Sequence, residues 1–219
     1  DGGVDTVILE NFGDAPFVRT QVGPHVVAMM TRIALAVRGV GLTLGINVLR
    51  NDAQAAMAIA AAVGAEFIRI NVHTGAAWTD QGLIQGDAYQ TLMYRKQLGV
   101  SVNIAADVMV KHATQAGTRT LLDAAKDTLK RGGALHLIIT GTATGAVVNV
   151  KELANLRVSL PNTSIWIGSG IDMDNVEEVL QFADGAIVGT YFHTEGDLGK
   201  PLDTDRISRL VKLVSEVYS

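Results

Sequence analysis

Two segments decide the fold of this chain: Ser164-Ile165-Trp166-Ile167-Gly168-Ser169-Gly170 and Asp184-Gly185-Ala186-Ile187-Val188-Gly189-Thr190. Each is a short apolar run that ends in small residues, which is typical of a buried strand followed by a tight turn. A helical pattern over residues 174–182 lies between them. The two segments are therefore predicted to be neighbouring parallel strands joined by a helix.

The same alternation of apolar run and helical pattern continues along the chain. Strands are predicted at residues 4–9, 42–48, 67–72, 102–108, 135–139, 165–167 and 186–188. Helices are predicted at residues 24–38, 51–64, 87–98, 118–131, 150–160, 174–182 and 205–218. Strands that are almost continuous Val, Ile and Leu are typical of a parallel sheet covered by helices.

Seven strand–helix units are compatible with an open doubly wound sheet or with a barrel. Polar residues at the carboxyl end of nearly every strand, together with glycine-rich turns after the last two, favour an α/β fold of the (β/α)8 TIM-barrel type. The seven units then correspond to strands 2 to 8 of the barrel. We expect one further βα unit of about 30 residues before Asp1, and we expect residues 1–219 to form a single barrel domain.

Composition excludes several classes of function. The chain has 219 residues, 48% of them hydrophobic, a net charge of −4 and no cysteine. Disulfides, thiolate catalysis and cysteine-based zinc sites are therefore excluded. The absence of a Lys/Arg cluster argues against a nucleic-acid partner. The longest apolar run, residues 55–65, is too short for a transmembrane segment.

The two glycine-rich turns predict a phosphate site. Glycine has no Cβ, so an anion can approach the main-chain N–H groups, and a following helix adds the positive end of its dipole. In a (β/α)8 barrel the loops after strands seven and eight commonly hold a phosphate. The alternative is that these glycines only form tight βα turns. The predicted phosphate-binding residues are Gly168, Ser169, Gly170, Gly189 and Thr190.

Polar residues at other strand ends predict catalytic groups. Asp107 is flanked by alanines and valine, so burial is expected to raise its pKa and suit it as a general base. Lys111 is its natural partner and can stabilise an oxyanion or a phosphate, although the pair can equally serve only to hold the βα loop. The predicted catalytic residues are Asp107, Lys111, Glu10 and Asn71.

Four further residues are predicted to contact substrate: Asn47, Arg50, Asp80 and His112. Arg50 can clamp a carboxylate or phosphate, or form a structural ion pair. Asp80 lies in a long polar loop predicted at residues 73–86, whose glycine-bracketed part, residues 74–82, we interpret as a mobile lid. The sequence shows no metal-ligand spacing and requires no cofactor, although a divalent metal can enter with a substrate phosphate.

Several motifs resemble the BtpA family of photosystem I biogenesis proteins. They are the segments at residues 10–17 (ENFGDAPF), 47–52 (NVLRND), 69–72 (RINV), 79–84 (TDQGLI), 107–112 (DVMVKH) and 168–170 (GSG). The resemblance covers essentially the whole chain and implies a (β/α)8 barrel of the ribulose-phosphate-binding type. The sequence departs from the family at His136, where an acidic residue is expected, and at His193, where lysine is expected.

The resemblance leaves two functions open. Cyanobacterial members resemble peripheral thylakoid proteins that stabilise the photosystem I reaction centre, whereas other members occur in non-photosynthetic organisms. The protein is therefore expected to be a photosystem I biogenesis factor or an enzyme, of lyase, isomerase or hydrolase type, that acts on a small phosphorylated, sugar-like molecule. We expect a homo-oligomer, located in the cytoplasm or on the cytoplasmic face of a thylakoid membrane, with a peripheral membrane complex as its partner in the second location.

Overall fold

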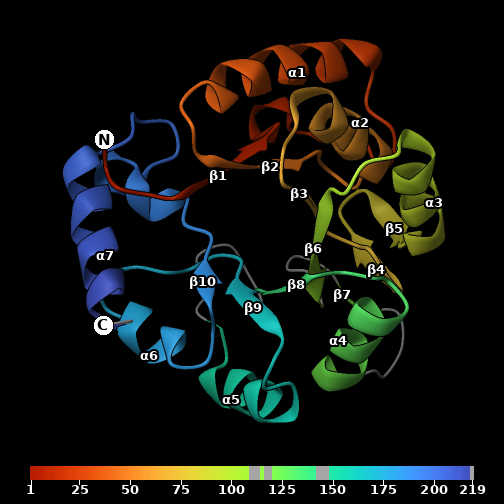
Figure 1. Ribbon diagram of the computed structural model, residues 1–219. Coiled ribbons are helices and arrows are strands. Elements are labelled where there is room, and N and C mark those ends of the chain that lie inside the picture. The colour runs from red at the N-terminus through yellow and green to blue at the C-terminus, as the bar shows by residue number, and fades with distance from the viewer. Residues whose placement is uncertain (109–113, 116–119, 142–147, 218–219) are drawn as a thin grey trace.

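A computed structural model describes residues 1–108, 114–115, 120–141 and 148–217 of the protein. Its main feature is a curled parallel sheet whose strands follow one another in the order β1-β2-β3-β6-β8-β9-β10 (Figure 1). Because the strand order follows the chain order without reversing, the sheet is of the barrel type and not doubly wound. The strands are β1 (Thr6–Glu10), β2 (Thr43–Asn47), β3 (Phe67–Ile70), β6 (Asn103–Val108), β8 (His136–Ile139), β9 (Ser164–Ile167) and β10 (Gly185–Ala186).

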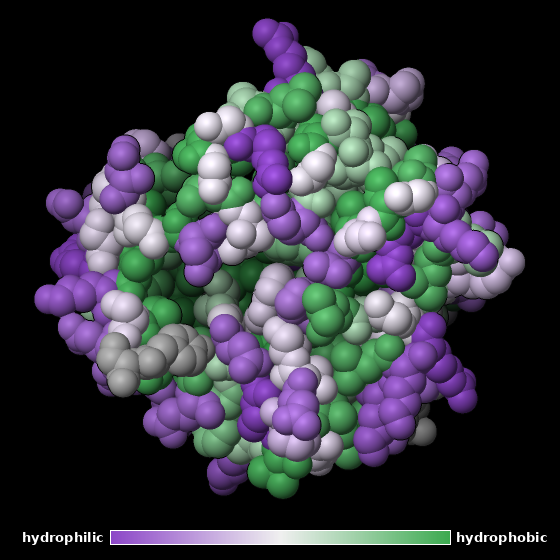
Figure 2. Space-filling model, viewed as in Figure 1, coloured by the Kyte–Doolittle hydropathy of each residue, from purple (hydrophilic) through white to green (hydrophobic). Residues whose placement is uncertain are grey.

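Helices surround the sheet (Figure 1). They are α1 (Pro24–Arg38), α2 (Ala53–Val63), α3 (Ala88–Leu98), α4 (Leu121–Lys130), α5 (Val150–Ser159), α6 (Val176–Leu180) and α7 (Thr204–Val217). Strands β1 and β10 form the two edges of the sheet. In the space-filling view a hollow with apolar walls lies in the region between these two edges (Figure 2). Among the described residues, none of the helices combines the length and the apolar character needed to cross a lipid bilayer.

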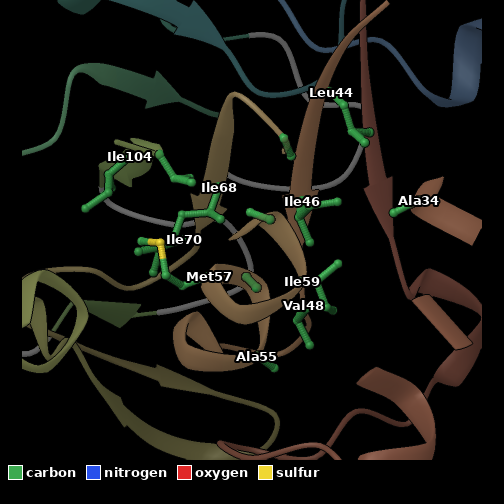
Figure 3. Close-up of a cluster of buried hydrophobic side chains, with 14 of the residues drawn as sticks. Ala34, Leu44, Ile46, Val48, Ala55, Met57, Ile59, Ile68, Ile70 and Ile104 are labelled. Carbon is green, nitrogen blue, oxygen red and sulfur yellow. The ribbon is translucent and has the colours of Figure 1, made fainter. Parts of the chain in front are cut away.

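Packing on the outer face of the sheet explains why the sequence of α2 is rich in alanine. Ile46 and Ile68 are fully buried against Met57 and Ile59 of α2 (Figure 3). Small side chains let the helix axis approach the sheet closely. The helix begins where the Asp52 carboxylate accepts a hydrogen bond from the N–H of Ala55, and it ends at Gly64, whose φ is 70°.

The inner face of the sheet has an apolar layer. Phe67, Ala105 and Ile138 are buried there, and the Trp166 ring packs edge-on against Phe67 at a centroid distance of 5.2 Å. His136 stacks on the same Trp166 ring at 4.1 Å. Aromatic rings in these two arrangements pack closely and fill the space against the inner face of the sheet. The polar residues described below lie further along the same strands.

The long loop predicted over residues 73–86, which includes the predicted lid at residues 74–82, is wrong as a loop. This segment forms an antiparallel hairpin of β4 (Ala76–Thr79) and β5 (Gly82–Gln85), and β4 also pairs with β7 (Thr114–Gln115). Ala77 and Ile84 are opposite one another and are buried against Val72. The Thr79 hydroxyl closes the turn by donating to the carbonyl of Gly82 and accepting from the N–H of Gln81. Burial of these apolar residues is what fixes the segment.

The last two units are shorter than predicted. The helix expected at residues 174–182 is the five-residue α6, and the strand expected at 186–188 is β10, Gly185–Ala186. The Asn175 side chain donates to the carbonyl of Gly170 and accepts from the N–H of Asp172. These bonds hold residues 170–175 in a turn, so the helix begins only at Val176.

Candidate functional site

A buried ion pair lies inside the curled sheet, near the carboxyl ends of its strands. Arg69 on β3 donates from Nε to Oδ1 of Asp107 at 3.0 Å and from Nη2 to Oδ2 at 3.1 Å. The two side chains are 8% and 0% exposed. Both face inward because each is two residues further along its strand than the inward-facing Phe67 and Ala105. A bidentate arginine–carboxylate pair of this kind holds both groups in fixed orientation.

Two asparagines extend the ion pair into a network across three strands. Asn71 donates from Nδ2 to Asp107 Oδ2 at 2.9 Å. Asn47, at the end of β2, donates to Asn71 Oδ1 at 3.2 Å and to the main-chain carbonyl of Arg69 at 3.0 Å. Both asparagines are buried. A network of buried, mutually bonded side chains is rigid, and the positions of its members are therefore defined together.

A second carboxylate lies on the other side of Arg69. Oε2 of Glu10, at the end of β1, is 3.9 Å from Nη1 of Arg69, and its side chain is 25% exposed. Burial alone would lower the pKa of Arg69, but the charge and hydrogen bonds of Asp107, with a contribution from Glu10, raise it overall. The guanidinium therefore stays charged between two carboxylates. We call Glu10, Asn47, Arg69, Asn71 and Asp107 the Arg69 cluster.

The glycine turn after β9 lies directly against this cluster. A Cβ atom on Gly168 would lie 3.5 Å from Nη2 of Arg69, 2.4 Å from Cγ2 of Thr140 and 2.7 Å from Cγ2 of Ile138. Side-chain packing therefore requires glycine at this position, whether or not an anion binds nearby. The predicted phosphate turn and the predicted catalytic carboxylate thus share one end of the sheet, with Arg69 between them.

The remaining predicted phosphate residues are arranged around two adjacent turns. Strands β9 and β10 are parallel neighbours, and the N–H of Ile187 donates to the carbonyl of Ile167 at 2.7 Å. Gly170 has a φ of 77°, and Gly189 is exposed, with no atom within 4 Å of the position that a Cβ would take. Thr190 opens a short 3-10 turn, η2 (Thr190–Phe192). Because α6 has only five residues and begins six residues after Gly170, its dipole contributes little to this turn.

Three buried polar atoms near this end of the sheet have no hydrogen-bond partner among the described residues: Asn47 Oδ1, Thr140 Oγ1 and Ser169 Oγ. Leaving a buried polar atom unpaired costs about 1–3 kcal/mol. Both amide hydrogens of Asn47 are donated within the Arg69 cluster. Its oxygen, which can only accept, is therefore the atom of this side chain that is left for a ligand. Orphaned buried groups of this kind are expected where a ligand completes the hydrogen bonding.

The other predicted site residues are less closely connected to this cluster. Arg50 follows β2, is half-buried, and donates its main-chain N–H to the carbonyl of Val18. Asp80 is exposed at the tip of the β4–β5 hairpin, where its carboxylate accepts from Gln81 Nε2. Lys111 and His112 lie outside the described residues. Within the described ranges, no group of three His, Cys, Asp or Glu residues could hold a metal ion.

Arg69, the residue that connects the cluster, was not among the site residues predicted from the sequence. A signal was available in the pattern Phe67-Ile68-Arg69-Ile70-Asn71, which places Phe67, Arg69 and Asn71 on one face of a buried strand. A charged residue on the inner face of a buried strand requires a partner of opposite charge. Asp107, at the end of the neighbouring strand β6, and Glu10, at the end of β1 two strands away, were the available carboxylates.

The sheet and the polar cluster at the carboxyl ends of its strands define a (β/α)-barrel protein. A solved structure with this fold is thiamine phosphate pyrophosphorylase from Pyrococcus furiosus, which superposes with a TM-score of 0.65 at 17% identity, over 100% of this chain and 86% of that chain. The family model described as the BtpA family matches residues 1–216. The chain therefore belongs to the BtpA family.

Two relatives illustrate the range of this family. The photosystem I biogenesis protein BtpA of Synechocystis sp. is 45% identical over 216 residues, which cover 98% of this chain and 75% of the relative. An uncharacterized protein of Thermococcus kodakarensis is 43% identical over 218 residues, which cover 99% of this chain and 82% of that protein. The family is thus found in a cyanobacterium and in an archaeon at similar identity to this chain.

Proposed function

We propose that the protein binds a small phosphorylated, sugar-like molecule at the carboxyl ends of its strands and acts on it by acid–base chemistry. The observation that carries this proposal is the proximity of the glycine turn to the buried Arg69–Asp107 pair, since a Cβ on Gly168 would lie 3.5 Å from Arg69 Nη2. An anion-binding turn beside a fixed carboxylate is the arrangement that lets a barrel hold a phosphate and act on the rest of the molecule.

In this proposal the two turns after β9 and β10 hold the phosphate. Main-chain N–H groups of Ser169, Gly170, Gly189 and Thr190 are its donors, and Gly168 lets the turn pack closely against Thr140 and Ile138. Arginine and asparagine side chains fix Asp107, which with Glu10 exchanges protons with the substrate. Lys111 neutralises the charge that develops, and Arg50, Asp80 and His112 contact the substrate. Asn47 Oδ1, which lacks a partner among the described residues, accepts from a substrate hydroxyl.

The proposal is tested by thermal unfolding with ribose 5-phosphate and with ribose as matched probes. A ligand at 100 times its dissociation constant stabilises the folded state by about 2.7 kcal/mol. We expect stabilisation by the phosphorylated probe only. Gly189→Asp should abolish it, because the new carboxylate repels the phosphate without a steric clash. Gly13→Asp is the matched control, since Gly13 is also exposed with open space around it.

Two outcomes would count against this function. Equal stabilisation by ribose and ribose 5-phosphate would show that the phosphate group does not contribute to binding. Equal loss in the Gly189 and Gly13 variants would show that added charge alone is responsible. A wider panel of phosphorylated metabolites, each paired with its dephosphorylated form, then identifies the substrate class by the largest difference within a pair.

A second candidate function is a role in photosystem I biogenesis, on a thylakoid membrane and with a peripheral membrane complex as the partner of a homo-oligomer. It is favoured by the name of the 45% identical Synechocystis relative. The two functions are separated by complementing a Synechocystis strain that lacks that relative. If assembly alone matters, Asp107→Asn should complement as well as the unaltered protein at equal abundance. If the chemistry matters, complementation should fail.

A further inference from the structure

The guanidinium of Arg69 has more donors than the Arg69 cluster uses. An arginine side chain carries five N–H groups. Among the described residues, two of them have an acceptor: Nε donates to Asp107 Oδ1, and one N–H of Nη2 donates to Asp107 Oδ2. Nη1 is 3.9 Å from Glu10 Oε2, which is too long for a hydrogen bond. The Arg69 side chain is 8% exposed, so the remaining donors have little access to water.

Thr140 brings a further unpaired hydroxyl to the same place. It follows β8 two residues after the inward-facing Ile138, so its side chain also faces the interior of the sheet. Its Oγ1 atom is buried and has no hydrogen-bond partner within the described ranges. Thr140 Cγ2 and Arg69 Nη2 lie 2.4 Å and 3.5 Å from one point, the position that a Cβ on Gly168 would take. The threonine and the guanidinium are therefore neighbours, next to the glycine turn.

Buried donors without acceptors indicate a ligand that supplies acceptors. The donors left over in the described part of this site are both N–H groups of Nη1, the second N–H of Nη2 and the Thr140 hydroxyl. Leaving such groups unpaired is unfavourable, and native structures rarely do so. One oxygen atom has the lone pairs to accept from two of these donors at once. The group that completes this part of the site is therefore an oxygen acceptor.

The charges around Arg69 disfavour a second anion at this point. Asp107 binds one side of the guanidinium, and the Glu10 carboxylate lies 3.9 Å from Nη1. Within the described residues, one cation is thus already shared by two carboxylates. A further carboxylate or a phosphate beside Arg69 would be repelled by both of them at short range. The acceptor is therefore expected to be an uncharged oxygen.

A carbonyl oxygen fits these donors better than a hydroxyl. A hydroxyl adds a hydrogen of its own to a point where the guanidinium already donates, whereas a carbonyl only accepts. A carbonyl oxygen held by a guanidinium is also polarised, and negative charge that develops on it is stabilised. The Glu10 carboxylate, whose side chain is 25% exposed, lies beside the guanidinium and can accept a proton from the neighbouring carbon.

We propose that the substrate is a phosphorylated hydroxyketone or hydroxyaldehyde in its open-chain form, and that its carbonyl oxygen binds to Arg69 and Thr140. This inference rests on the proposed function, because the turns after β9 and β10 hold the phosphate end of the molecule. It narrows the substrate class from phosphorylated molecules in general to those with a free carbonyl. Thr140 is thereby a substrate-binding residue.

Isothermal titration calorimetry with matched phosphate esters tests the inference. Dihydroxyacetone phosphate, glycerol 3-phosphate and phosphoglycolate have a carbonyl, a hydroxyl and a carboxylate, respectively, at the carbon next to the one that bears the phosphate. Ribulose 5-phosphate and ribitol 5-phosphate repeat the comparison of carbonyl and hydroxyl with a longer chain. We expect the carbonyl member of at least one pair to bind about fivefold more tightly, the effect of one net hydrogen bond. Phosphoglycolate should bind more weakly than dihydroxyacetone phosphate.

Variants of Thr140 assign the preference to this site. Thr140→Val removes the hydroxyl and keeps a methyl group against Gly168, so the preference for the carbonyl member should fall about threefold. Thr140→Ser keeps the hydroxyl and should keep the preference. Thr31→Val is the matched control, because the Thr31 hydroxyl donates to the Val27 carbonyl within α1. Binding is compared within a pair of ligands on the same variant, so a general loss of stability does not imitate a loss of preference.

Several results would overturn the inference. Equal binding of the carbonyl and hydroxyl members of both pairs, or tightest binding of phosphoglycolate, would do so while leaving the phosphate site intact. A preference that is unchanged in Thr140→Val would exclude the threonine from the site. If Thr140→Val weakens inorganic phosphate as strongly as the carbonyl compounds, the phosphate itself occupies this position. If neither the esters nor inorganic phosphate bind, the proposed function fails, and this inference fails with it.

Discussion

Arg69 lies between the glycine turn and the candidate catalytic carboxylate, because its Nη2 atom both bonds Asp107 at 3.1 Å and lies 3.5 Å from the position that a Cβ on Gly168 would take. This one side chain connects β3, β6 and the turn after β9. The two halves of the proposed site therefore depend on each other through a single guanidinium.

Replacing Arg69 should be strongly destabilising. Arg69→Met leaves Asp107 buried with no cation beside it among the described residues, and removing one partner of a buried ion pair costs about 3–5 kcal/mol. Urea unfolding followed by circular dichroism measures this loss. The matched control is Arg38→Met, which breaks a pair with Glu66 whose side chains are 40% and 39% exposed, and should cost at most about 1 kcal/mol.

A double variant separates the buried charge from lost packing. Arg69→Met combined with Asp107→Leu removes both charges, so it should recover much of the stability lost in Arg69→Met alone. If the double variant is no more stable than the single one, the cost comes from packing or from the asparagines. Equal losses for Arg69→Met and Arg38→Met would contradict the description of a buried pair.

Alanine at the two turns should distinguish a packed glycine from an open one. Gly168→Ala places a methyl group 2.4 Å from Thr140 Cγ2 and 2.7 Å from Ile138 Cγ2, and overpacking of this kind costs about 1–3 kcal/mol. Gly189→Ala meets nothing within 4 Å and should leave the midpoint of thermal unfolding nearly unchanged. Comparable losses at both positions would contradict the assigned packing.

Stability should fall as the pH is lowered from about 7.5 to 5.5. Burial lowers the pKa of His73, with Arg95 adding to the effect and the hydrogen bond to Gly132 opposing it, and burial also lowers the pKa of His136. The unfolded chain binds protons near pH 6.5, where the folded chain does not, so protonation favours unfolding as the pH falls. Thermal unfolding across this range measures the slope.

The control for this pH dependence is a variant with both histidines replaced by glutamine, which should show a flatter profile of stability against pH over the same range.

Glu66 does not contribute to the slope in this pH range. Burial alone would raise the pKa of Glu66, but its hydrogen bonds with Leu44 N–H and Arg38 lower it overall. Glu66 therefore contributes its stability above its unfolded pKa and loses it only at more acidic pH, outside this range. An unchanged slope in the glutamine variant would exclude the histidines as the cause.

The sequence predicted those parts of the structure that repeat along the chain. The parallel strands, the bounds of α1 and the approximate extent of α2 follow from local patterns of apolar residues and turn residues. Asn71 and Asp107 were expected to meet because the carboxyl ends of parallel strands lie at one end of a barrel. They do meet, at 2.9 Å.

Features that depend on long-range contacts could not be predicted in the same way. Asp107 is bound by the guanidinium of Arg69, 38 residues earlier, which the sequence did not indicate. Its expected partner Lys111 lies outside the described residues. The hairpin at residues 76–85 was interpreted as a lid because four-residue strands between glycines give a weak local signal. Its order comes from Val72 and Ile84 packing together, which no local pattern shows.

The central claim, an anion site at the turns after β9 and β10, is tested most directly by 31P NMR of inorganic phosphate. The phosphate signal should broaden when the protein is added, and it should stay sharp with Gly189→Asp but broaden normally with Gly13→Asp. If the unaltered protein and both variants give the same line width, the turns do not bind phosphate and the proposed site is wrong.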